Sequence, residues 1–352
     1  MIRCPVELGG EHPSKIIRCN IWGEIEVDGL ARAIIDTWAF QRLHYIRQTG
    51  MVYKVFPTAR TTRFENALGA YHVARMILNR LLVAQPGLFD GETPYHLIAI
   101  ASLCKNLGMG PFGHVFDTYL RSAAKEEDDP WISHDYRACI ILERIVSDMT
   151  FPYRLGKNDL SFIQALVCPD KFMHHAIREW FACIVNDRHD VVDAGRIDYL
   201  MRDTMSTGMQ RGFNIDRIIN GMRVIDGRLC FCERVCDDLR MFMWARSNMF
   251  DNVYRHPKVM EFEAWVIIML ARDERLAVPL DYDRFISLTD DSFLGVWMNT
   301  ASWRSIETRV VPSPPRVADP PTGHKSYLTG RVWVYPRKNP TRCHVIDIRE
   351  AS

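Results

Sequence analysis

The sequence lacks a charge imbalance and lacks any long hydrophobic run. Lys and Arg number 44 against 43 Asp and Glu, which gives a formal net charge of +1. A chain without a net field does not gather nucleic acid or an anionic membrane by overall charge, so binding of a polyanion needs a local site. No apolar run approaches the ~20 residues that a membrane-spanning helix needs. We therefore expect no membrane partner.

Disulfide patterns and targeting signals are also missing. The ten cysteines are scattered, and the opening stretch MIRCPVELGG is too polar for a secretory signal peptide. Scattered free thiols are typical of a reducing compartment, so we expect an intracellular protein, cytoplasmic or nuclear. The tightest group, Cys230, Cys232 and Cys236, has no fourth ligand at a zinc-ribbon spacing. Buried free thiols are the favoured interpretation over a metal site.

Apolar residues are abundant and mostly have helical spacing. They make up 47% of the chain, enough for a sizeable core. From Ser14 to Asp28 they alternate with polar residues around a Trp-Gly step, which predicts a short β-hairpin. The spacing then predicts a helix over 29–49 that Gly50 would end. Further helices are expected at 63–85, 94–107, 133–148, 158–168, 172–186, 215–224, 236–272 with breaks, and 282–299.

The C-terminal part has a different pattern. Five prolines between Val310 and Lys325 exclude a helix or a central strand and indicate an extended linker. Beyond them, RVWVY and CHVIDI flank a turn-rich PRKNPTR, which predicts a terminal β-hairpin. The expected division is a tail over 1–13, a core over 14–308, a proline-rich linker over 309–326 and a C-terminal β-hairpin over 327–352.

Six stretches in a fixed order carry a resemblance to a known family. They are FQRLHYIRQTG (40–50), VFPTARTTRFENALG (55–69), LCKNLGMGPFGHVFD (103–117), SHD (133–135), DAGRIDYLMRD (193–203) and ARSNMFDNVYRHPKV (245–259). Over roughly residues 14–300 the chain resembles the HD-domain dNTP triphosphohydrolases, above all the catalytic core of the SAM-and-HD-domain members. The resemblance implies a mainly α fold: an HD-domain helical bundle with a short N-terminal and a small C-terminal β-hairpin.

The metal-ligand positions of that family are all substituted. The family holds one metal ion with two histidines and two aspartates, and the matching positions here are Asn66, Lys105, Asn106 and Gly195. An amide is a feeble ligand for a transition metal, glycine offers none, and a lysine ammonium repels a cation. We therefore expect no intact catalytic metal site and no cofactor. Asn66 and Asn106 are interpreted as hydrogen-bonded interior amides.

The resemblance also implies that much of the nucleotide pocket is kept. Arg63 and Arg246 resemble phosphate-facing arginines, whose planar charged fork suits an oxyanion. Tyr254 resembles a residue near the sugar, and His134 one that assists the leaving group. The full set of nucleotide-binding candidates is Gln48, Arg63, Lys105, His114, His134, Tyr199, Asp203, Arg246 and Tyr254, with Asp117 at the catalytic periphery.

Lys105 leaves two interpretations open. Its ammonium would stand where the family has its metal, so together with Arg63, Arg196 and Arg246 it would hold a dNTP or GTP without cutting it. Alternatively, Lys105 reaches solvent or pairs with Asp198 or Asp203 and leaves a collapsed cleft.

The family's regulatory guanine-nucleotide site, which lies between subunits, is only partly matched. Lys15, Asp36 and Gln41 correspond to residues of that site, and His44 replaces an arginine. Because the replacement removes a permanent cation, the favoured interpretation is that Asp36 and Gln41 only cap and brace the first helix.

Three functions follow as hypotheses. The first is a catalytically inactive HD-domain pseudoenzyme that serves as a scaffold or binding protein, acts as a homodimer or with another protein partner, and retains a nucleotide. The second is an active dNTP or dGTP triphosphohydrolase with a non-standard divalent metal site, regrouped around His114, Asp117 and His134. An enzyme stripped of its ligands is the kind of gene that large DNA viruses keep, so a viral origin is also expected.

The third hypothesis is a protein that binds single-stranded nucleic acid. Cations and tyrosines punctuate the N-terminal third, although such a pattern is more often a solvated helix face. The residues are Arg32, Arg42, Arg47, Lys54, Arg60 and Arg63, with Tyr45 and Tyr53 among them.

Overall fold

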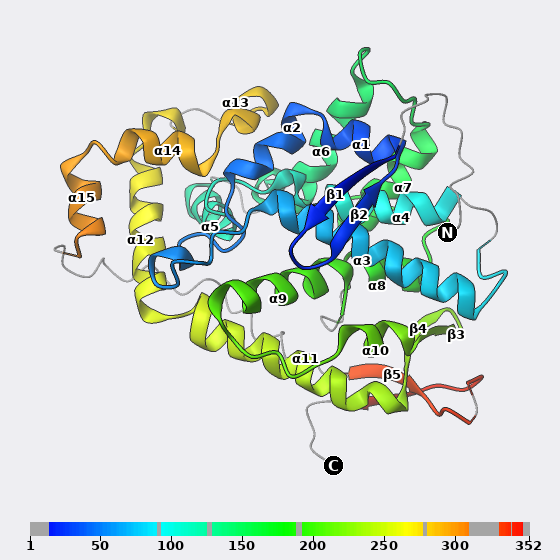
Figure 1. Cartoon of the computed structure of the whole chain (residues 1–352). Coiled ribbons are helices and arrows are strands. Elements are labelled where there is room, and N and C mark those ends of the chain that lie inside the picture. The colour runs from blue at the N-terminus through cyan, green and yellow to red at the C-terminus, as the bar shows by residue number, and fades with distance from the viewer. Residues whose placement is uncertain are drawn as a thin grey trace.

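A computed structural model describes residues 14–89, 93–124, 129–187, 192–276, 280–309, 331–338 and 340–347. The predicted tail over 1–13 lies outside the described residues, and so does all of the predicted linker except Arg309. Elsewhere the chain is mainly helical, as predicted (Figure 1).

The N-terminal hairpin forms where the alternating pattern predicts it. Strands β1 (Lys15–Cys19) and β2 (Gly23–Val27) pair antiparallel, with Ile17 opposite Ile25. Ile25 and Val27 point into the core and are fully buried. The polar residues between them remain outside, so one face of the hairpin covers the helical bundle.

The predicted single helix over 29–49 is wrong, because the chain breaks it twice. Helix α1 (Gly29–Ile35) stops at Asp36, and the extended backbone of Thr37 (ψ 150°) lets its hydroxyl cap α2 (Trp38–Gln41). A 3₁₀ turn, η1 (Arg42–Tyr45), follows and ends at Ile46, whose backbone is extended. Helical spacing of apolar residues does not distinguish one long helix from three short turns around the same core.

The centre of the bundle is built on α3 (Arg63–Ala84). A capping box between Thr62 and Glu65 begins this helix, which packs against α4 and α9. Around it lie α4 (Thr93–Cys104), the 3₁₀ turn η3 (Lys105–Gly108), α5 (His114–Ala123), α6 (His134–Ser147), α7 (Lys157–Val167), α8 (Glu179–Val185) and α9 (Ala194–Thr207). The prediction over 172–186 was too long, since its first seven residues are turn and loop.

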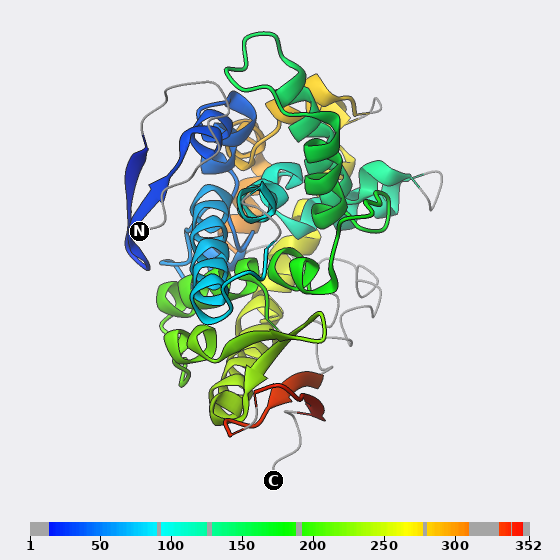
Figure 2. The same cartoon turned by 90° about the vertical axis from the view of Figure 1, so that its right-hand side faces the viewer.

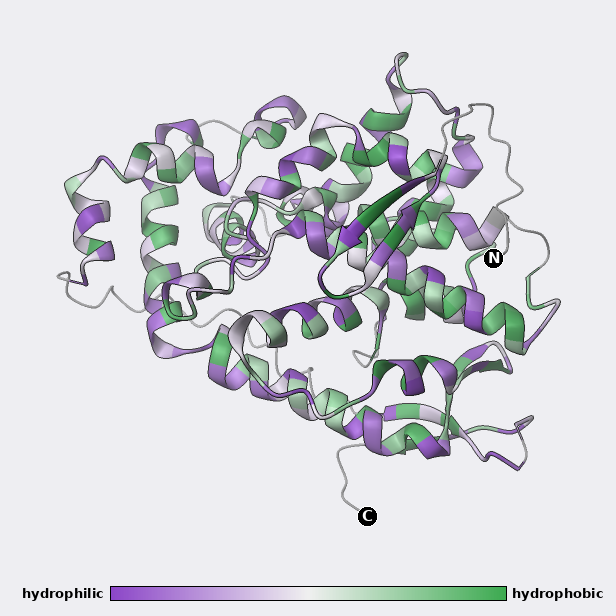
Figure 3. Cartoon of the chain, in the orientation of Figure 1, coloured by the Kyte–Doolittle hydropathy of each residue, from purple (hydrophilic) through white to green (hydrophobic). Residues whose placement is uncertain are grey.

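The second half of the chain forms one wall of the molecule. Helix α11 (Cys236–Met249) runs through a π-helical turn, η6 (Phe250–Tyr254), into α12 (Pro257–Ala271), which stands upright in Figure 1. Helices α13 (Tyr282–Ser287), α14 (Asp290–Trp297) and α15 (Ala301–Glu307) then pack beside it. Figure 3 shows that α12 is hydrophobic along most of its length, as expected of a helix with neighbours on several sides.

The predicted C-terminal hairpin exists but is not a separate unit. Helix α10 (Ile215–Asn220) is shorter than the predicted 215–224 because β3 (Met222–Ile225) and β4 (Arg228–Cys232) follow it. Strand β5 (Arg331–Tyr335) pairs parallel with β4, Cys230 opposite Trp333, and antiparallel with β6 (His344–Asp347). The result is a four-stranded sheet in the order β3-β4-β5-β6 at the lower edge of Figures 1 and 2.

Candidate functional site

A central cavity of about 810 Å³ lies between α3, η3, α5, α9 and the continuous wall of α11, η6 and α12. It is lined by all of the predicted nucleotide-binding residues, namely Gln48, Arg63, Lys105, His114, His134, Tyr199, Asp203, Arg246 and Tyr254. The three other positions of the lost metal site, Asn66, Asn106 and Gly195, line it as well. Residues up to 206 positions apart in the sequence therefore meet in one place.

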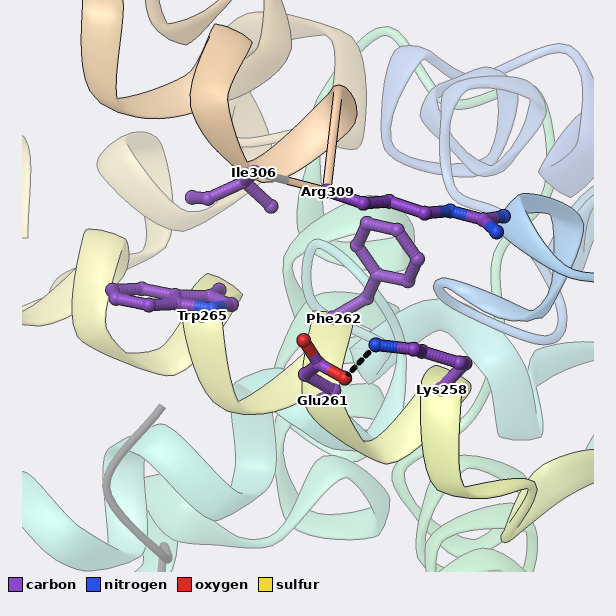
Figure 4. Close-up of a pocket in the computed structure, with 6 residues that line it drawn as sticks. All are labelled: Lys258, Glu261, Phe262, Trp265, Ile306 and Arg309. Atoms are coloured by element: carbon purple, nitrogen blue, oxygen red, sulfur yellow. Dashed lines mark hydrogen bonds and ion pairs between the residues drawn. The ribbon is translucent and has the colours of Figure 1, made fainter. Parts of the chain in front are cut away.

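A second pocket, between α12 and α15, is too small to compete with it. Figure 4 shows its lining residues, Lys258, Glu261, Phe262, Trp265, Ile306 and Arg309. Its volume is about 10 Å³, which is room for a single water molecule.

Two of the four positions matched to the family's metal ligands, Asn66 and Asn106, are joined by a hydrogen bond. Arg63 Nη1 donates to Asn106 Oδ1 (3.4 Å), and Asn106 Nδ2 donates to Asn66 Oδ1 (2.9 Å). Asn66 Nδ2 in turn donates to Asp198 Oδ2 (2.8 Å). Both amides are buried, so the structure places them as the hydrogen-bonded interior amides that the sequence analysis expects. Neither amide, nor the ammonium of Lys105, nor Gly195 offers the ligand set of a transition metal, so this group of residues does not fit the family's metal ion.

Asp198 anchors this network and is completely buried. Besides Asn66, its carboxylate accepts hydrogen bonds from Trp22 Nε1 (2.7 Å), Arg202 Nε (3.1 Å) and Arg202 Nη2 (2.8 Å). Burial works against the charge of Arg202, but the carboxylate of Asp198 raises the pKa of that guanidinium above its ordinary value. Gly69 of α3 permits the close approach, since a Cβ there would lie 1.7 Å from Asp198 Oδ1.

Lys105 matches neither interpretation in full. Its Nζ donates to Asn186 Oδ1 (2.9 Å) and to the carbonyl of Val185 (3.3 Å), at the C-terminal end of α8. An ammonium is well placed there, because backbone carbonyls without helical partners point toward it. It contacts neither Asp198 nor Asp203, and the cavity beside it has not collapsed.

Two arginines and a protonatable carboxyl define the polar part of the cavity. Arg63 is buried, which lowers its pKa to about 10, so it stays charged at neutral pH, and its Nε has no acceptor. Arg246 is also buried, with its guanidinium 5.8 Å from the ring centre of Phe250. Tyr254 donates to Asp203 Oδ2 (2.7 Å), and burial raises the pKa of Asp203 to about 7.

The two kept histidines share one carboxylate. His134 Nδ1 lies 2.8 Å and His114 Nδ1 3.5 Å from Asp117 Oδ2, while Asp117 Oδ1 accepts from the buried Arg137. The surrounding cavity wall withdraws His114 from bulk water and lowers its pKa to about 4, although 68% of its side chain is exposed to the cavity. Burial also opposes the charge on His134, but Asp117 outweighs it and raises the pKa of His134. At neutral pH the pair therefore consists of a neutral His114 and a more basic His134.

The residues matched to the regulatory nucleotide site are engaged in local contacts. Asp36 ends α1 and pairs with Arg32 (3.5 Å), and Gln41 Nε2 donates to the carbonyl of Ile35 (2.8 Å). His44 stacks on Phe64 with the ring centres 3.6 Å apart, and burial lowers the pKa of His44. Lys15 lies on β1 with its residue exposed. These contacts match the expected capping and bracing roles of Asp36 and Gln41.

The cations proposed for nucleic-acid binding do not form an open patch. Arg42 is fully buried and donates to the carbonyls of Leu107, Met109 and Leu288. Arg63 faces the cavity, and Arg47 and Lys54 pair with Asp290 and Glu307. A nucleic-acid role therefore stays a prediction with no support from the described residues.

Several curated proteins are similar to this chain over most of its length. No protein-family model matches it. An HD domain-containing protein of Acanthamoeba polyphaga mimivirus is 32% identical over 314 residues, which are 83% of this chain and 66% of the relative. The deoxynucleoside triphosphate triphosphohydrolase SAMHD1 of Homo sapiens is 28% identical over 321 residues, 81% of this chain and 51% of the relative. This chain belongs to the HD-domain, dNTP triphosphohydrolase-like family.

Membership of the HD-domain family confirms the predicted resemblance and the mainly α fold. The SAMHD1 homologue of Dictyostelium discoideum is 31% identical over 244 residues, 69% of this chain and 46% of the relative. The chain thus spans between 46% and 66% of the length of these three relatives. Among the described residues no helix is long and apolar enough to cross a membrane.

One cavity residue of this HD-domain protein was missed by the sequence analysis. Glu263 of α12 lines the cavity, and its carboxyl has no hydrogen bond or ion pair with any described residue. Burial raises its pKa to about 8, and no neighbouring charge contributes. A helical period does link it to Met260 and Ile267, which line the same wall, but the sequence does not show that a cavity lies on that side.

The raised pKa of Glu263 predicts a pH-dependent stability. Below its unfolded pKa of about 4.3 the carboxyl is neutral in both states, and its ionisation makes no contribution to stability. As pH rises towards about 8, the unfolded chain loses the proton and the folded chain keeps it, so stability falls. Because water can enter the cavity and screen part of the effect, we expect Glu263→Gln to stabilise the fold by about 2 kcal/mol at pH 8.

Urea unfolding at pH 8 and at pH 4.5 measures this difference. At pH 4.5 the two proteins should agree within about 0.5 kcal/mol, since the neutral acid and the amide are similar in size. An equal gain at both pH values would mean that ionisation of Glu263 is not the cause.

Proposed function

We propose that this chain is a catalytically inactive HD-domain protein that binds a nucleoside triphosphate in the central cavity and acts as a binding protein or scaffold. The observation that carries the proposal is the hydrogen-bonded chain from Arg63 through Asn106 and Asn66 to Asp198. It occupies the positions at which the family is expected to hold its metal, and it leaves the rest of the cavity wall in place.

The loss of hydrolysis follows from the chemistry of these side chains. A divalent ion polarises the phosphate and generates the attacking hydroxide in metal-dependent hydrolysis. The amide oxygens of Asn66 and Asn106 each accept one hydrogen bond within the network, and the lone pair that each oxygen keeps is only a feeble donor to such an ion. The ammonium of Lys105 adds a positive charge at the same place, and this charge repels a metal ion but attracts a phosphate.

Retained nucleotide binding follows from what lines the cavity. Its volume of about 810 Å³ is in the range of small-molecule sites. Arg63 Nε points at no acceptor, and Asp203 Oδ1 and Gln48 Oε1 are buried without a partner as well. Buried polar atoms without partners are rare in folded proteins, and a ligand that carries phosphate and hydroxyl groups would satisfy them.

Calorimetric titration with dGTP and with GTP, in chelator and again with magnesium, tests this proposal. We expect micromolar binding that chelator does not reduce, because cationic side chains take the place of the metal. Arg63→Gln should weaken binding about tenfold to a hundredfold, the usual effect of removing a charge-assisted hydrogen bond.

The matched control for that variant is Arg217→Gln, whose side chain is 60% exposed and lies on α10 away from the cavity. It should bind nucleotide as the natural chain does. Binding that disappears in chelator, or that is the same in both variants, would contradict the proposal.

A working triphosphohydrolase is the second candidate, and one observation favours it. Ligand atoms of His114, Asp117 and His134 lie within 4.8 Å of one another, which is compatible with a metal ion. Against it, Asp117 already accepts from Arg137 and His134, so a metal would compete with two existing partners. Release of inorganic triphosphate from any dNTP, abolished by chelator, would favour this candidate over the inactive protein.

We also propose that the chain forms a homodimer or binds another protein. We propose in addition that it is of viral origin and acts inside a cell. One of the similar proteins is viral. Light scattering of the purified chain, with and without nucleotide, would give its oligomeric state.

A further inference from the structure

Glu263 is a carboxyl group that faces the central cavity without a partner. It lies in the middle of α12, and no described residue forms a hydrogen bond or ion pair with it. Gly50 leaves the space beside it: this glycine has a φ of +54°, and a Cβ there would come 3.5 Å from Glu263 Oε1 and 3.0 Å from the carbonyl oxygen of Phe112. The carboxyl therefore lies close to the backbone of Gly50, where the Cβ of a larger residue would be in van der Waals contact with it.

The surroundings of Glu263 are apolar. Met260, Ala264 and Ile267 of α12 line the cavity around it, together with Val52 and Val115 from the facing segments. A lone carboxyl in such a setting is costly to ionise, and the raised pKa of Glu263 reflects that cost. A group of this kind is usually kept only where a ligand supplies the missing partners.

The wall from α11 to α12 carries several polar side chains, with Arg255 and Glu261 among them. Arg246 on α11 supplies a cation, Tyr254 at the end of η6 an aromatic ring beside Asp203, and Glu263 on α12 a carboxyl. No cation contributes to the pKa of Glu263. The charges of Arg63 and Arg246 therefore do not stabilise its carboxylate. The stretch of α12 from Pro257 to Ile267 extends the wall by about 15 Å. A ligand with an anionic end and a flat, hydrogen-bonding end fits this order.

We propose that Glu263 binds the base of the nucleotide and selects guanine. The proposal rests on the nucleotide binding proposed above and names the base. An ionised carboxylate accepts two hydrogen bonds side by side, and guanine presents two adjacent donors, N1–H and the 2-amino group. Adenine, cytosine and thymine have no such pair on one edge. The apolar residues around Glu263 would cover the faces of the ring, and its proton would leave to solvent as guanine binds.

The test compares dGTP with dITP, which is the same nucleotide without the 2-amino group. Calorimetry in chelator at pH 8, where about half of the Glu263 carboxyls are ionised, should give dGTP an affinity about tenfold or more above that of dITP. Glu263→Gln cannot present two acceptor oxygens, so it should bring the two affinities to within about threefold.

Glu261→Gln is the matched control on the same helix. Glu261 also lines the central cavity, but its carboxylate pairs with Lys258 at 2.5 Å (Figure 4) and is already occupied, so the preference for dGTP should persist in this variant. At pH 7 the natural chain should also release close to one proton more per dGTP bound than Glu263→Gln. Other titratable groups of the cavity, such as His114 and Asp203, are common to both proteins and cancel in the difference.

The outcomes separate the two proposals. If dGTP, dITP and dATP bind equally well and Glu263→Gln changes nothing, the base selection is wrong while nucleotide binding stands. If none of these nucleotides binds the natural chain, the proposed function is overturned and the base selection with it.

Discussion

A variant with the four family ligands restored is expected to acquire a metal ion. Asn66→His, Lys105→His, Asn106→Asp and Gly195→Asp together should bind about one equivalent of Mn²⁺, Fe²⁺ or Zn²⁺, whereas the natural chain should retain less than about a tenth. The positions are suitably placed, since Asn106 Nδ2 lies 2.9 Å from Asn66 Oδ1 and all four residues line one cavity. Gly195 has room for a side chain, because the nearest atom to a Cβ there is Asp193 Oδ1 at 3.5 Å.

Elemental analysis after dialysis against a weak chelator measures the result. The double variant Asn66→His and Asn106→Asp is the control, because it keeps the repelling charge of Lys105 and lacks two ligands. It should remain close to the natural chain in metal content. A natural chain that already carries about one equivalent would overturn the proposed inactivity, because its four substitutions would then not have removed the site.

Asp198→Ala is expected to destabilise the fold by about 3–5 kcal/mol. The substitution removes the carboxylate that neutralises the buried Arg202 and leaves an uncompensated charge in the interior. It also leaves Trp22 Nε1 and Asn66 Nδ2 without the acceptor to which both donate, the carboxylate of Asp198. Because Asn66 is linked to Asn106 and Arg63, we expect the cavity wall to loosen as well. Urea denaturation followed by circular dichroism gives the free energy of unfolding.

An exposed ion pair provides the comparison. Asp291 is 58% exposed and lies 3.5 Å from Arg47, so Asp291→Ala should cost less than about 0.5 kcal/mol. If Asp198→Ala cost no more than Asp291→Ala, the buried network would not be holding the cavity wall.

Several details of the site could be predicted because they follow from residue chemistry and ordered motifs. Asn66 and Asn106 were expected to be interior amides, and they are, since an amide that replaces a metal ligand in a buried position must find a hydrogen-bond partner. The hydrogen-bond partners of Lys105 were not predicted. Its partner, the end of α8, is 80 positions away in the sequence and is no acidic residue.

The helices and strands also include features that the sequence predicts and features that it does not. The capping box at Thr62 and Glu65 marks the start of α3 in the sequence, and the helix begins there. The break at Thr37 and the strands β3 and β4 were missed, because short turns and short strands depend on the surfaces that they pack against. The parallel pairing of β5 with β4 joins segments about a hundred residues apart and leaves no local signal.

The sequence alone indicated the family and predicted the mainly α fold and the substitution of the family's four metal ligands, because each of these depends on the identity of residues within ordered motifs. Only the tertiary structure decided that the residues matched to the nucleotide pocket line one cavity, that Asp198 anchors the hydrogen bonds of Asn66 and Arg202, and that Glu263 lines the cavity without a hydrogen bond or ion pair to any described residue. Tertiary packing sets how far a side chain is buried and which hydrogen-bond partners it has. The pKa and the function of a carboxyl depend on these surroundings.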